Sequence, residues 1–190
     1  MVKLGFIVEG DAEKIILDSE PAKQLFSKNN ISIVGIFAAE GEGNFKVESE
    51  RIKRFVQVLN DRKADQIIIW TDLENDPCIT FTLESIHKFD ERKQINLISV
   101  KALESWFLAD SKTLSKIFGQ EAYYDNPEEL VTDPFMEIKN LFMKYTGRGI
   151  SKSKNRLAHK MIRNGFSIQN AARHPKCRSA RYFIDKLKTL

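Results

Sequence analysis

The sequence predicts an α/β protein built around a parallel β-sheet, and three observations support that fold class. First, four short and mostly apolar runs, typical of strands buried on both faces, occupy residues 4–8, 31–39, 66–71 and 95–100. Second, the segments between them have helical length and occupy residues 11–28, 45–62 and 79–93. Third, strands and helices alternate, which favours right-handed βαβ units. A chain of 190 residues, 42% hydrophobic and 29% charged, fits one domain or one domain with an elaborated half.

The predicted helices of this half have recognisable internal features. Acidic residues gather in the first turn of the first helix, where the helix dipole favours them, and Pro21 is expected to kink this helix or divide it in two. A glycine-rich loop, residues 41–44, follows the second strand at its carboxyl end. The inner face of the second helix is expected to hold five apolar side chains: Val47, Ile52, Phe55, Val56 and Leu59.

Beyond residue 100 the pattern becomes helical throughout. Helices are expected over residues 102–109, 114–118, 135–145, 151–164 and 179–187. Asn126-Pro127 and Asp133-Pro134 each place a capping residue before a proline, which is typical of a helix start. We therefore expect residues 1–110 to form an α/β core. Residues 111–190 would form a helical, basic elaboration packed on that core within one structural unit.

Acidic residues follow the first and third predicted strands where those strands end. Glu9 and Gly10 follow the first strand, and Asp72, Glu74 and Asp76 follow the third. Parallel α/β sheets bind ligands at the carboxyl ends of their strands, and Mg²⁺ prefers oxygen ligands. Glu9 joins Asp72 if the first and third strands are neighbours, which implies the sheet order 2-1-3-4. Glu74 reaches the same ion if its backbone remains extended.

These acids have an alternative role as helix caps. Acidic side chains after buried strands commonly cap the next helix, and this alternative applies to Asp11, Glu13, Glu74 and Asp76. Carboxylates crowded at one rim also repel one another. Without a cation, at least one of them is expected to bind a proton more readily than a free side chain does.

Charge is distributed unevenly along the chain. Residues 1–100 carry a balance of −4 and residues 101–190 a balance of +8, with 12 basic residues and one acidic residue between Arg148 and Lys188. An acidic front half and a basic rear half suit a metal-using site that handles a polyanion such as nucleic acid, and the alternative is a solvated basic face. The candidate phosphate contacts are Lys152, Lys154, Arg156, Lys160, Arg163 and Arg181.

The spacing of four of these basic residues predicts how they are arranged on a helix. Lys152, Arg156, Lys160 and Arg163 are four, four and three residues apart, so they are expected to share one helical face. Arg181 has a second interpretation, in which it pairs with an acid of the site.

Composition excludes several classes of protein. No apolar run approaches the roughly 20 residues that span a bilayer, and the first residues lack the pattern of a secretory signal. Cys78 and Cys177 have no metal or disulfide spacing, so we expect reduced thiols in a cytoplasmic protein. The loop at residues 41–44 lacks the lysine of a Walker-type loop, which argues against ATP hydrolysis.

Two motifs resemble the TOPRIM domain, the topoisomerase–primase fold. Residues 6–13 (FIVEGDAE) and 68–74 (IIWTDLE) match the Glu after strand one and the D-x-D after strand three. Residues 101–110 (KALESWFLAD), the glycine-rich loop and the ending 179–183 (SARYF) are similar to a group of small stand-alone TOPRIM-like bacterial proteins. The resemblance implies a four-stranded, parallel, Rossmann-like sheet.

The resemblance also implies residue roles. Glu9 would act as acid/base or as a metal ligand, and Asp72 with Glu74 would hold Mg²⁺ or Mn²⁺. The family's second Asp is Glu74 here, so Asp76 is an alternative ligand. Gly10, Glu13 and Glu104 are secondary site candidates, with Glu104 an extra ligand, a partner for a basic residue, or simply an acid at a helix start.

The expected function is metal-dependent hydrolysis of nucleic-acid phosphodiesters with water as nucleophile, in a bacterial defence or mobile-element setting that the resemblance implies. One alternative is a non-catalytic TOPRIM-fold module that binds a nucleic acid, a nucleotide or a protein partner. Another is a small-molecule phosphotransfer enzyme that uses the same rim.

Overall fold

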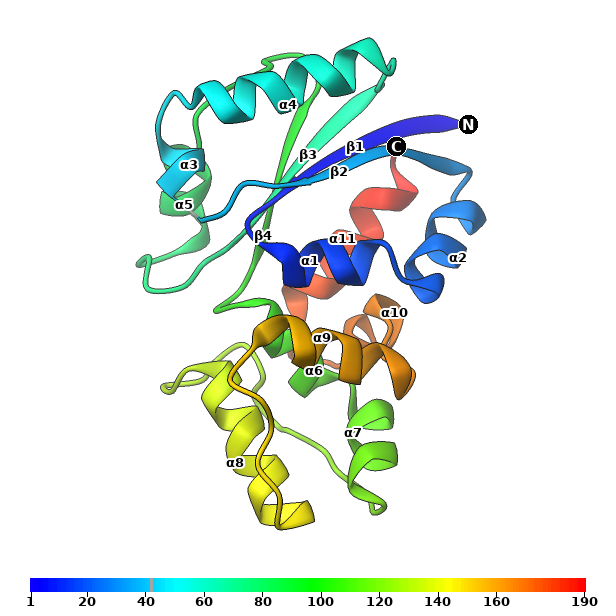
Figure 1. Ribbon diagram of the computed structural model, residues 1–190, viewed down its shortest axis with the longest axis vertical. Helices are drawn as coiled ribbons and strands as arrows, with labels where there is room; N and C mark the ends of the chain where they lie inside the picture. The colour runs from blue at the N-terminus through cyan, green and yellow to red at the C-terminus, as the bar shows by residue number, and fades with distance from the viewer. Residues whose placement is uncertain (42) are drawn as a thin grey trace.

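A central four-stranded sheet organises the protein. The computed structural model describes residues 1–41 and 43–190, except for the side chain of Asn44. All strands are parallel, in the order β2-β1-β3-β4 (Figure 1). Their bounds are Val2–Val8 for β1, Ile31–Ala38 for β2, Gln66–Asp72 for β3 and Gln94–Ser99 for β4. The predicted fold class and sheet order are both confirmed.

Alternating side chains of the strands face two apolar cores. Phe6, Ile68 and Trp70 belong to the larger core, whereas Ile7 and Ile69 point to the smaller one. Figure 1 shows α4 alone above the sheet and α1, α2 and α11 below it. The larger core continues into the helices that follow β4, so the sheet and the helical half share apolar packing.

The first two predicted helices are each divided. The predicted helix at residues 11–28 forms α1 (Asp11–Leu17) and α2 (Glu20–Lys28), because Ser19 caps α2 with Pro21 in its first turn. The predicted helix at residues 45–62 forms α3 (Gly43–Lys46) and α4 (Glu50–Asp61). Val47 lies between these two helices and is 59% exposed, so its prediction as an inner residue is wrong. Helix α3 takes up part of the predicted loop, and Glu42 lies outside the described residues.

The third predicted helix is shorter than expected. It forms only α5 (Ile79–Ser85), and Ile86 already has extended backbone angles. The residues after it use side-chain hydrogen bonds in place of a helix. Asp90 Oδ1 accepts from the backbone N–H groups of Arg92 and Lys93, and Gln94 Oε1 accepts from that of Phe89.

The helical half follows β4. Its helices are α6 (Leu103–Ala109), α7 (Ser111–Phe118), α8 (Pro134–Thr146), α9 (Lys154–Arg163), α10 (Ile168–Ala172) and α11 (Arg178–Lys188). Helix α9 starts three residues later than predicted, and α10 is not among the predicted helices. The helix predicted after Asn126 is also wrong, because Glu128 turns inward and accepts hydrogen bonds from Arg178 N and Ser179 N at the start of α11.

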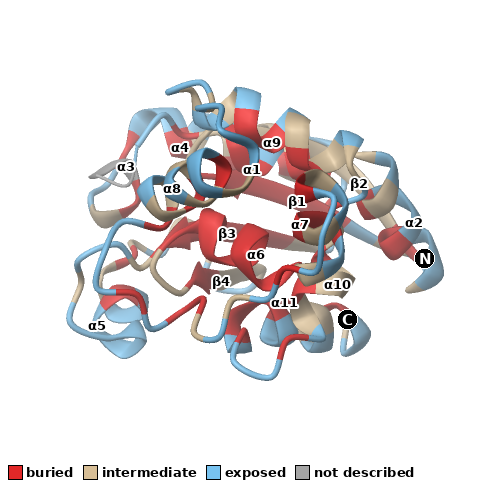
Figure 2. Ribbon diagram, turned by 90° about the horizontal axis from the view of Figure 1, so that it is seen from below, coloured by how far each residue is buried: buried red, intermediate tan, exposed pale blue. Residues whose placement is uncertain are grey.

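Asp110 joins three segments of this half. Its side chain is 1% exposed and accepts hydrogen bonds from Thr113 N and Thr113 Oγ1 in α7. It also accepts longer hydrogen bonds from Ser167 N and Asn170 Nδ2 at the start of α10. Viewed from below in Figure 2, α6 and the sheet are mostly buried around this region. The carboxylate therefore fixes α6, α7 and α10 relative to one another.

Candidate functional site

Glu9 and Asp72 meet at the carboxyl edge of the sheet. Strands β1 and β3 are hydrogen-bonded neighbours with Val8 opposite Trp70, so the residues that follow lie side by side. Glu9 Oε2 accepts hydrogen bonds from Thr71 Oγ1 at 2.7 Å and from Asp72 N at 3.1 Å. Asp72 is 3% exposed, and its Oδ1 accepts from Leu103 N at 3.0 Å. The carboxylate of Asp72 thus links the end of β3 to the start of α6.

Glu13 and Glu104 bring two more carboxylates to this edge from α1 and α6. Glu13 is 5% exposed, and its Oε2 accepts from Gly10 N at 3.0 Å, which closes a capping box at the start of α1. Glu104 is 1% exposed, and neither of its oxygens accepts a hydrogen bond from a described residue. We call Glu9, Glu13, Asp72 and Glu104 together the carboxylate group.

Burial and mutual repulsion weaken the acidity of this group. Burial raises the pKa of Glu13 to about 7, and the charges of Glu104 and Glu9 add to the effect. The pKa of Asp72 is raised well above its ordinary value, first by burial and then by the charges of Glu13, Glu9 and Glu104. Burial also raises the pKa of Glu104. A buried carboxylate remains ionised at neutral pH only when a nearby cation or hydrogen bonds to its oxygens compensate the cost of burial.

Lys154 is the cation that approaches the carboxylate group. Its Nζ lies 3.5 Å from Glu104 Oε2, at the long end of ion-pair contact, and its side chain is 48% exposed. Burial alone would lower the pKa of Lys154, but the negative charges of Glu104, Asp72 and Glu13 raise it. Lys154 is also one of the predicted phosphate contacts, which stays a prediction, and its side chain lies beside Glu104.

The other two predicted ligands, Glu74 and Asp76, differ from the carboxylate group in backbone geometry and in partners. Glu74 has a φ of 47°, so the extended backbone on which its predicted reach depended is not present. Its backbone N–H donates to Lys101 O, and the residue is exposed. Asp76 forms an ion pair with Lys46 at 3.1 Å and accepts from Thr82 Oγ1 at 2.8 Å. The hydrogen bond from Thr82, together with Lys46, lowers the pKa of Asp76.

The carboxylate group suits a hard divalent cation held with water. Glu9 Oε1, Asp72 Oδ2 and both Glu104 oxygens accept no hydrogen bond from any described residue. Over the described part of the chain, no three His, Cys, Asp or Glu side chains are gathered into a group that could hold a metal ion alone. A direct protein ligand set of one or two carboxylates is the arrangement common for Mg²⁺, which keeps several waters.

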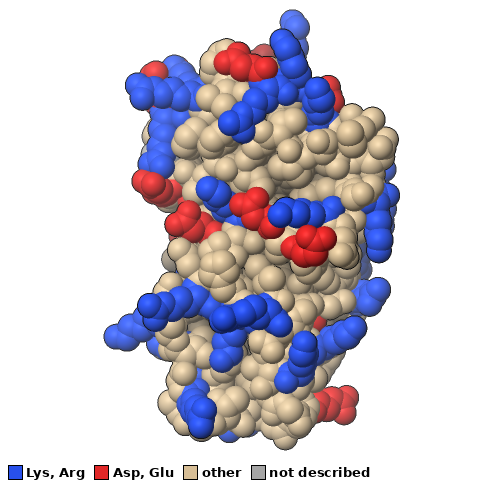
Figure 3. Space-filling model, turned by 45° about the vertical axis from the view of Figure 1, so that its right-hand side comes forward, with Lys and Arg blue, Asp and Glu red and all other residues tan. Residues whose placement is uncertain are grey.

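The basic residues divide between two regions. Arg156, Lys160 and Arg163 of α9 line a cavity of 220 Å³ with residues 149–151. Lys160 Nζ also lies 4.8 Å from the centre of the Phe142 ring. Lys152 precedes the helix and is exposed, so it does not share the helical face that was predicted for it. Figure 3 shows Lys and Arg in the majority over the lower part of the face it presents.

Arg181 has a structural role. Its Nη2 donates to His174 O at 2.9 Å and to Pro175 O at 3.2 Å, and its Nε donates to Ala172 O. Ala172 is the last residue of α10, and His174 and Pro175 follow it, so Arg181 caps the carboxyl end of that helix. The predicted pairing with an acid of the site is not among the contacts that the described residues make with Arg181, and its predicted phosphate contact stays a prediction.

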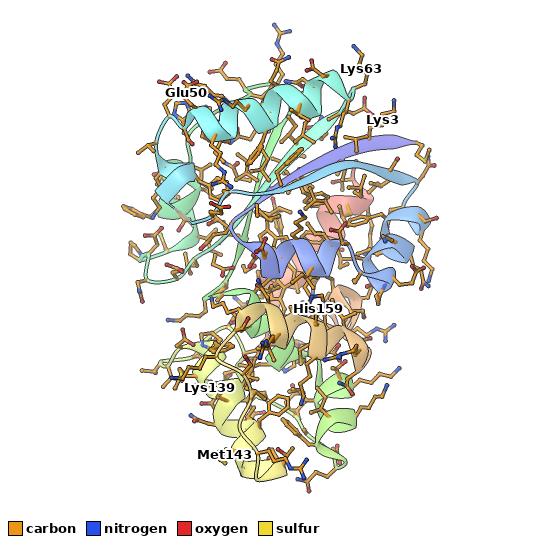
Figure 4. All side chains as sticks on the ribbon, in the orientation of Figure 1. Lys3, Glu50, Lys63, Lys139, Met143 and His159 are labelled. Carbon is orange, nitrogen blue, oxygen red and sulfur yellow. The ribbon has the colours of Figure 1, made fainter. Side chains whose placement is uncertain are left out.

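Helix α9 links the carboxylate group to the basic cavity. It packs on α1, with Asn155 Nδ2 donating to Asp11 Oδ2 and with His159, labelled in Figure 4, beside the groove between the two helices. Lys154 lies at its first residue and Arg163 at its last. No local sequence pattern predicts that α9 packs on α1, because the two helices are separated by more than 100 residues.

Comparison of the chain with protein-family models, with curated proteins and with solved structures finds no match. The TOPRIM relationship therefore stays a prediction from the motifs. Among the described residues, no helix has both the length and the apolar character needed to cross a membrane.

Proposed function

We propose that this protein hydrolyses phosphodiester bonds of nucleic acid with Mg²⁺ or Mn²⁺ as cofactor. The observation that carries the proposal is the convergence of four carboxylates, three of them nearly fully buried, on one edge of the sheet. They come from the ends of β1 and β3 and from the first turns of α1 and α6. Burying acids at this density costs stability, which favours a functional reason for keeping them.

The chain's own residues supply distinct parts of this chemistry. Glu9, Asp72 and Glu104 each have one carboxylate oxygen that no described donor contacts, and the second oxygen of Glu104 lies 3.5 Å from Lys154 Nζ. A bound divalent cation would polarise a phosphate oxygen and offset the charge that develops in the transition state. Glu9 is oriented by Thr71 and by the backbone of Asp72, so it is positioned to accept a proton from water.

The positions of Lys154 and of the basic cavity of α9 favour a polyanionic substrate. The side chain of Lys154 is half exposed, so its ammonium would contact a phosphate on one side while Glu104 lies on the other. Arg156 and Arg163 are seven residues apart on the same helix, a rise of roughly 10 Å. That separation spans more than one phosphate of a nucleic-acid strand, so α9 would direct the backbone of the strand toward the carboxylate group.

The test is cleavage of labelled single-stranded DNA, double-stranded DNA and RNA with Mg²⁺, Mn²⁺ or EDTA. The proposal predicts metal-dependent cleavage that Glu9→Gln lowers by about 10²–10⁴-fold, the range for loss of a general acid or base. Asp76→Asn is the matched control, because Asp76 is bound to Lys46 and Thr82, and it should retain cleavage. Metal-independent cleavage, or equal activity of the Glu9 variant, would refute the proposal.

The main alternative is a module that binds nucleic acid without cleaving it. One observation favours it: the pKa values of Glu13, Asp72 and Glu104 are raised, so these acids can be held protonated as structural groups without a metal. Salt-sensitive binding that survives Glu9→Gln, with no cleavage of any substrate, would support the module. Hydrolysis of mononucleotides alone would indicate a small-molecule enzyme instead.

A further inference from the structure

A second surface feature lies at the opposite margin of the sheet from β2. A cavity of about 550 Å³ runs along the outer edge of β4, between α5 and the start of α11. Its lining includes Ile79 and Leu83 from α5, Ile98 and Val100 from the strand region, and Arg178 and Tyr182 from α11. No member of the carboxylate group lines it. We call this cavity the β4 groove.

The floor of the β4 groove offers backbone hydrogen-bonding groups. Ile67 N donates to Lys93 O, and Leu73 N donates to Ser99 O, so the odd-numbered residues of β4 face β3. In a parallel ladder the intervening residues direct their N–H and C=O groups to the other side. For Asn96 and Ile98 that side is the free edge, where these groups have no partner among the described residues.

Helix α5 forms one wall and presents the apolar side of its sequence to solvent. Its single buried residue is Thr82, whose hydroxyl donates to Asp76 Oδ2. Ile79, Phe81 and Leu83 are instead 42%, 50% and 38% exposed. Figure 2 shows α5 as largely exposed beside β4. A helix that buries a threonine and exposes its large apolar residues is typical of a surface that a partner covers.

The opposite wall adds positive charge. Lys176 and Arg178 line the groove, and both are exposed. Glu128 also lines it, but its carboxylate accepts hydrogen bonds from Arg178 N and Ser179 N at the start of α11, which leaves Glu129 as the exposed acid of this wall. The groove therefore combines an open strand edge, an apolar wall, and a wall with two exposed basic residues, Lys176 and Arg178, against one exposed acid, Glu129.

We propose that the β4 groove binds an extended, acidic segment of a partner protein as a fifth strand of the sheet. The backbone of the segment would pair with Asn96 and Ile98, as in strand addition to an exposed sheet edge. Its apolar side chains, on alternate positions, would contact Ile79 and Leu83, and a carboxylate would contact Arg178. A second copy of this chain fits less well, because a two-fold contact sets the same basic wall against itself.

The test uses peptides as probes of the full-length protein. Peptides of 12 residues are selected from a random phage-displayed library against the wild type. Alternating apolar residues and at least one carboxylate are expected in the selected sequences. Leu83→Lys should weaken their binding at least tenfold, and Arg178→Glu should weaken acidic peptides while leaving the fold intact. Met143→Lys is the matched control, since Met143 is 55% exposed on α8 away from the groove (Figure 4).

Amide hydrogen exchange separates strand addition from other modes of binding. With peptide at 100 times its Kd, exchange of the Asn96 and Ile98 amide protons should slow by about 100-fold. The Leu97 amide, which already faces β3, should change little. Three results would overturn the proposal: no peptide selected that depends on Leu83, no slowing at the two edge amides, or a wild-type dimer that Leu83→Lys converts to monomer. The last result would assign the groove to a second copy.

Discussion

Glu13 makes the stability of the metal-free protein depend on pH in a direction opposite to that of most carboxylates. Its pKa is about 7 in the folded protein, against an ordinary value of 4.5, because burial and the nearby charges of Glu104 and Glu9 disfavour the charged form. Between these two pH values the folded state holds a proton that the unfolded state has released. The free energy of unfolding therefore falls as pH rises from 4.5 to 7, and the contribution is fully present below pH 4.5.

The size of the effect follows from the shift. A difference of about 2.5 pKa units corresponds to about 3 kcal/mol at 1.36 kcal/mol per unit. Glu13→Gln removes the titrating group and keeps an oxygen that can accept from Gly10 N. We compare the free energy of unfolding of the variant with that of the wild type at each pH. This difference should shift in favour of the variant by an amount on the order of 3 kcal/mol between pH 4.5 and pH 8.

Urea unfolding in EDTA at pH 4.5, 6 and 8 measures this difference. Glu20→Gln is the matched control, because Glu20 is also in the first turn of a helix but is exposed. The control should follow the pH profile of the wild type. If the wild type and Glu13→Gln have parallel profiles from pH 4.5 to 8, then Glu13 is not held protonated and the interpretation of the carboxylate group is wrong.

Three further predictions test other parts of the structure. Glu104→Gln should gain stability relative to the wild type between pH 5 and pH 8 in the metal-free protein, because burial raises the pKa of Glu104 and the variant lacks the group that ionises, and it should also lower cleavage; urea unfolding and the cleavage assay check this, and an equal stability difference at pH 5 and pH 8 would contradict it. Arg156→Gln should weaken nucleic-acid binding and reduce the slope of log K against log [NaCl] by about 0.7–0.9, as expected for one lost phosphate contact. Fluorescence anisotropy measures the slope, and Lys63→Gln, on the distant α4 side of the sheet, is the control (Figure 4). An unchanged slope for Arg156→Gln would show that Arg156 does not contact nucleic acid. Asp110→Ala should lower the free energy of unfolding by about 2 kcal/mol or more, since the carboxylate caps α7 and also accepts hydrogen bonds from the start of α10. A midpoint of thermal unfolding within 1 °C of that of the wild type would show that these contacts contribute nothing to stability.

The sheet could be predicted from the sequence because local signals were strong there. Runs such as Ile67–Ile69 are apolar on both faces, and the acids after β1 and β3 marked the carboxyl edge. The sheet order followed from the requirement that Glu9 and Asp72 meet, and the hydrogen bond between Asp72 N and Glu9 confirms that they do. The strand order could be predicted because Glu9 and Asp72 can share one site only if β1 and β3 are neighbours.

The parts that were not predicted depend on contacts distant in sequence. Residues 86–93 have a helical composition, but hydrogen bonds from backbone N–H groups to the side chains of Asp90 and Gln94 organise them as turns. The left-handed backbone of Glu74 removes the extended geometry that the D-x-E spacing suggested. Lys154 approaches Glu104 only because α9 packs on α1, and no local pattern encodes that packing. Sequence spacing thus identified the residue types of the site but not their partners.

The most direct test of the proposed metal site is calorimetric titration of Mg²⁺ and Mn²⁺ into the wild type, Asp72→Asn and Asp76→Asn. The amide of Asp72→Asn keeps an oxygen for Leu103 N but loses the charge that attracts a cation. The account predicts binding by the wild type and by Asp76→Asn, and loss of binding by Asp72→Asn. If the wild type binds neither ion, even with nucleic acid present, the carboxylate group is structural and the proposed hydrolytic function is wrong.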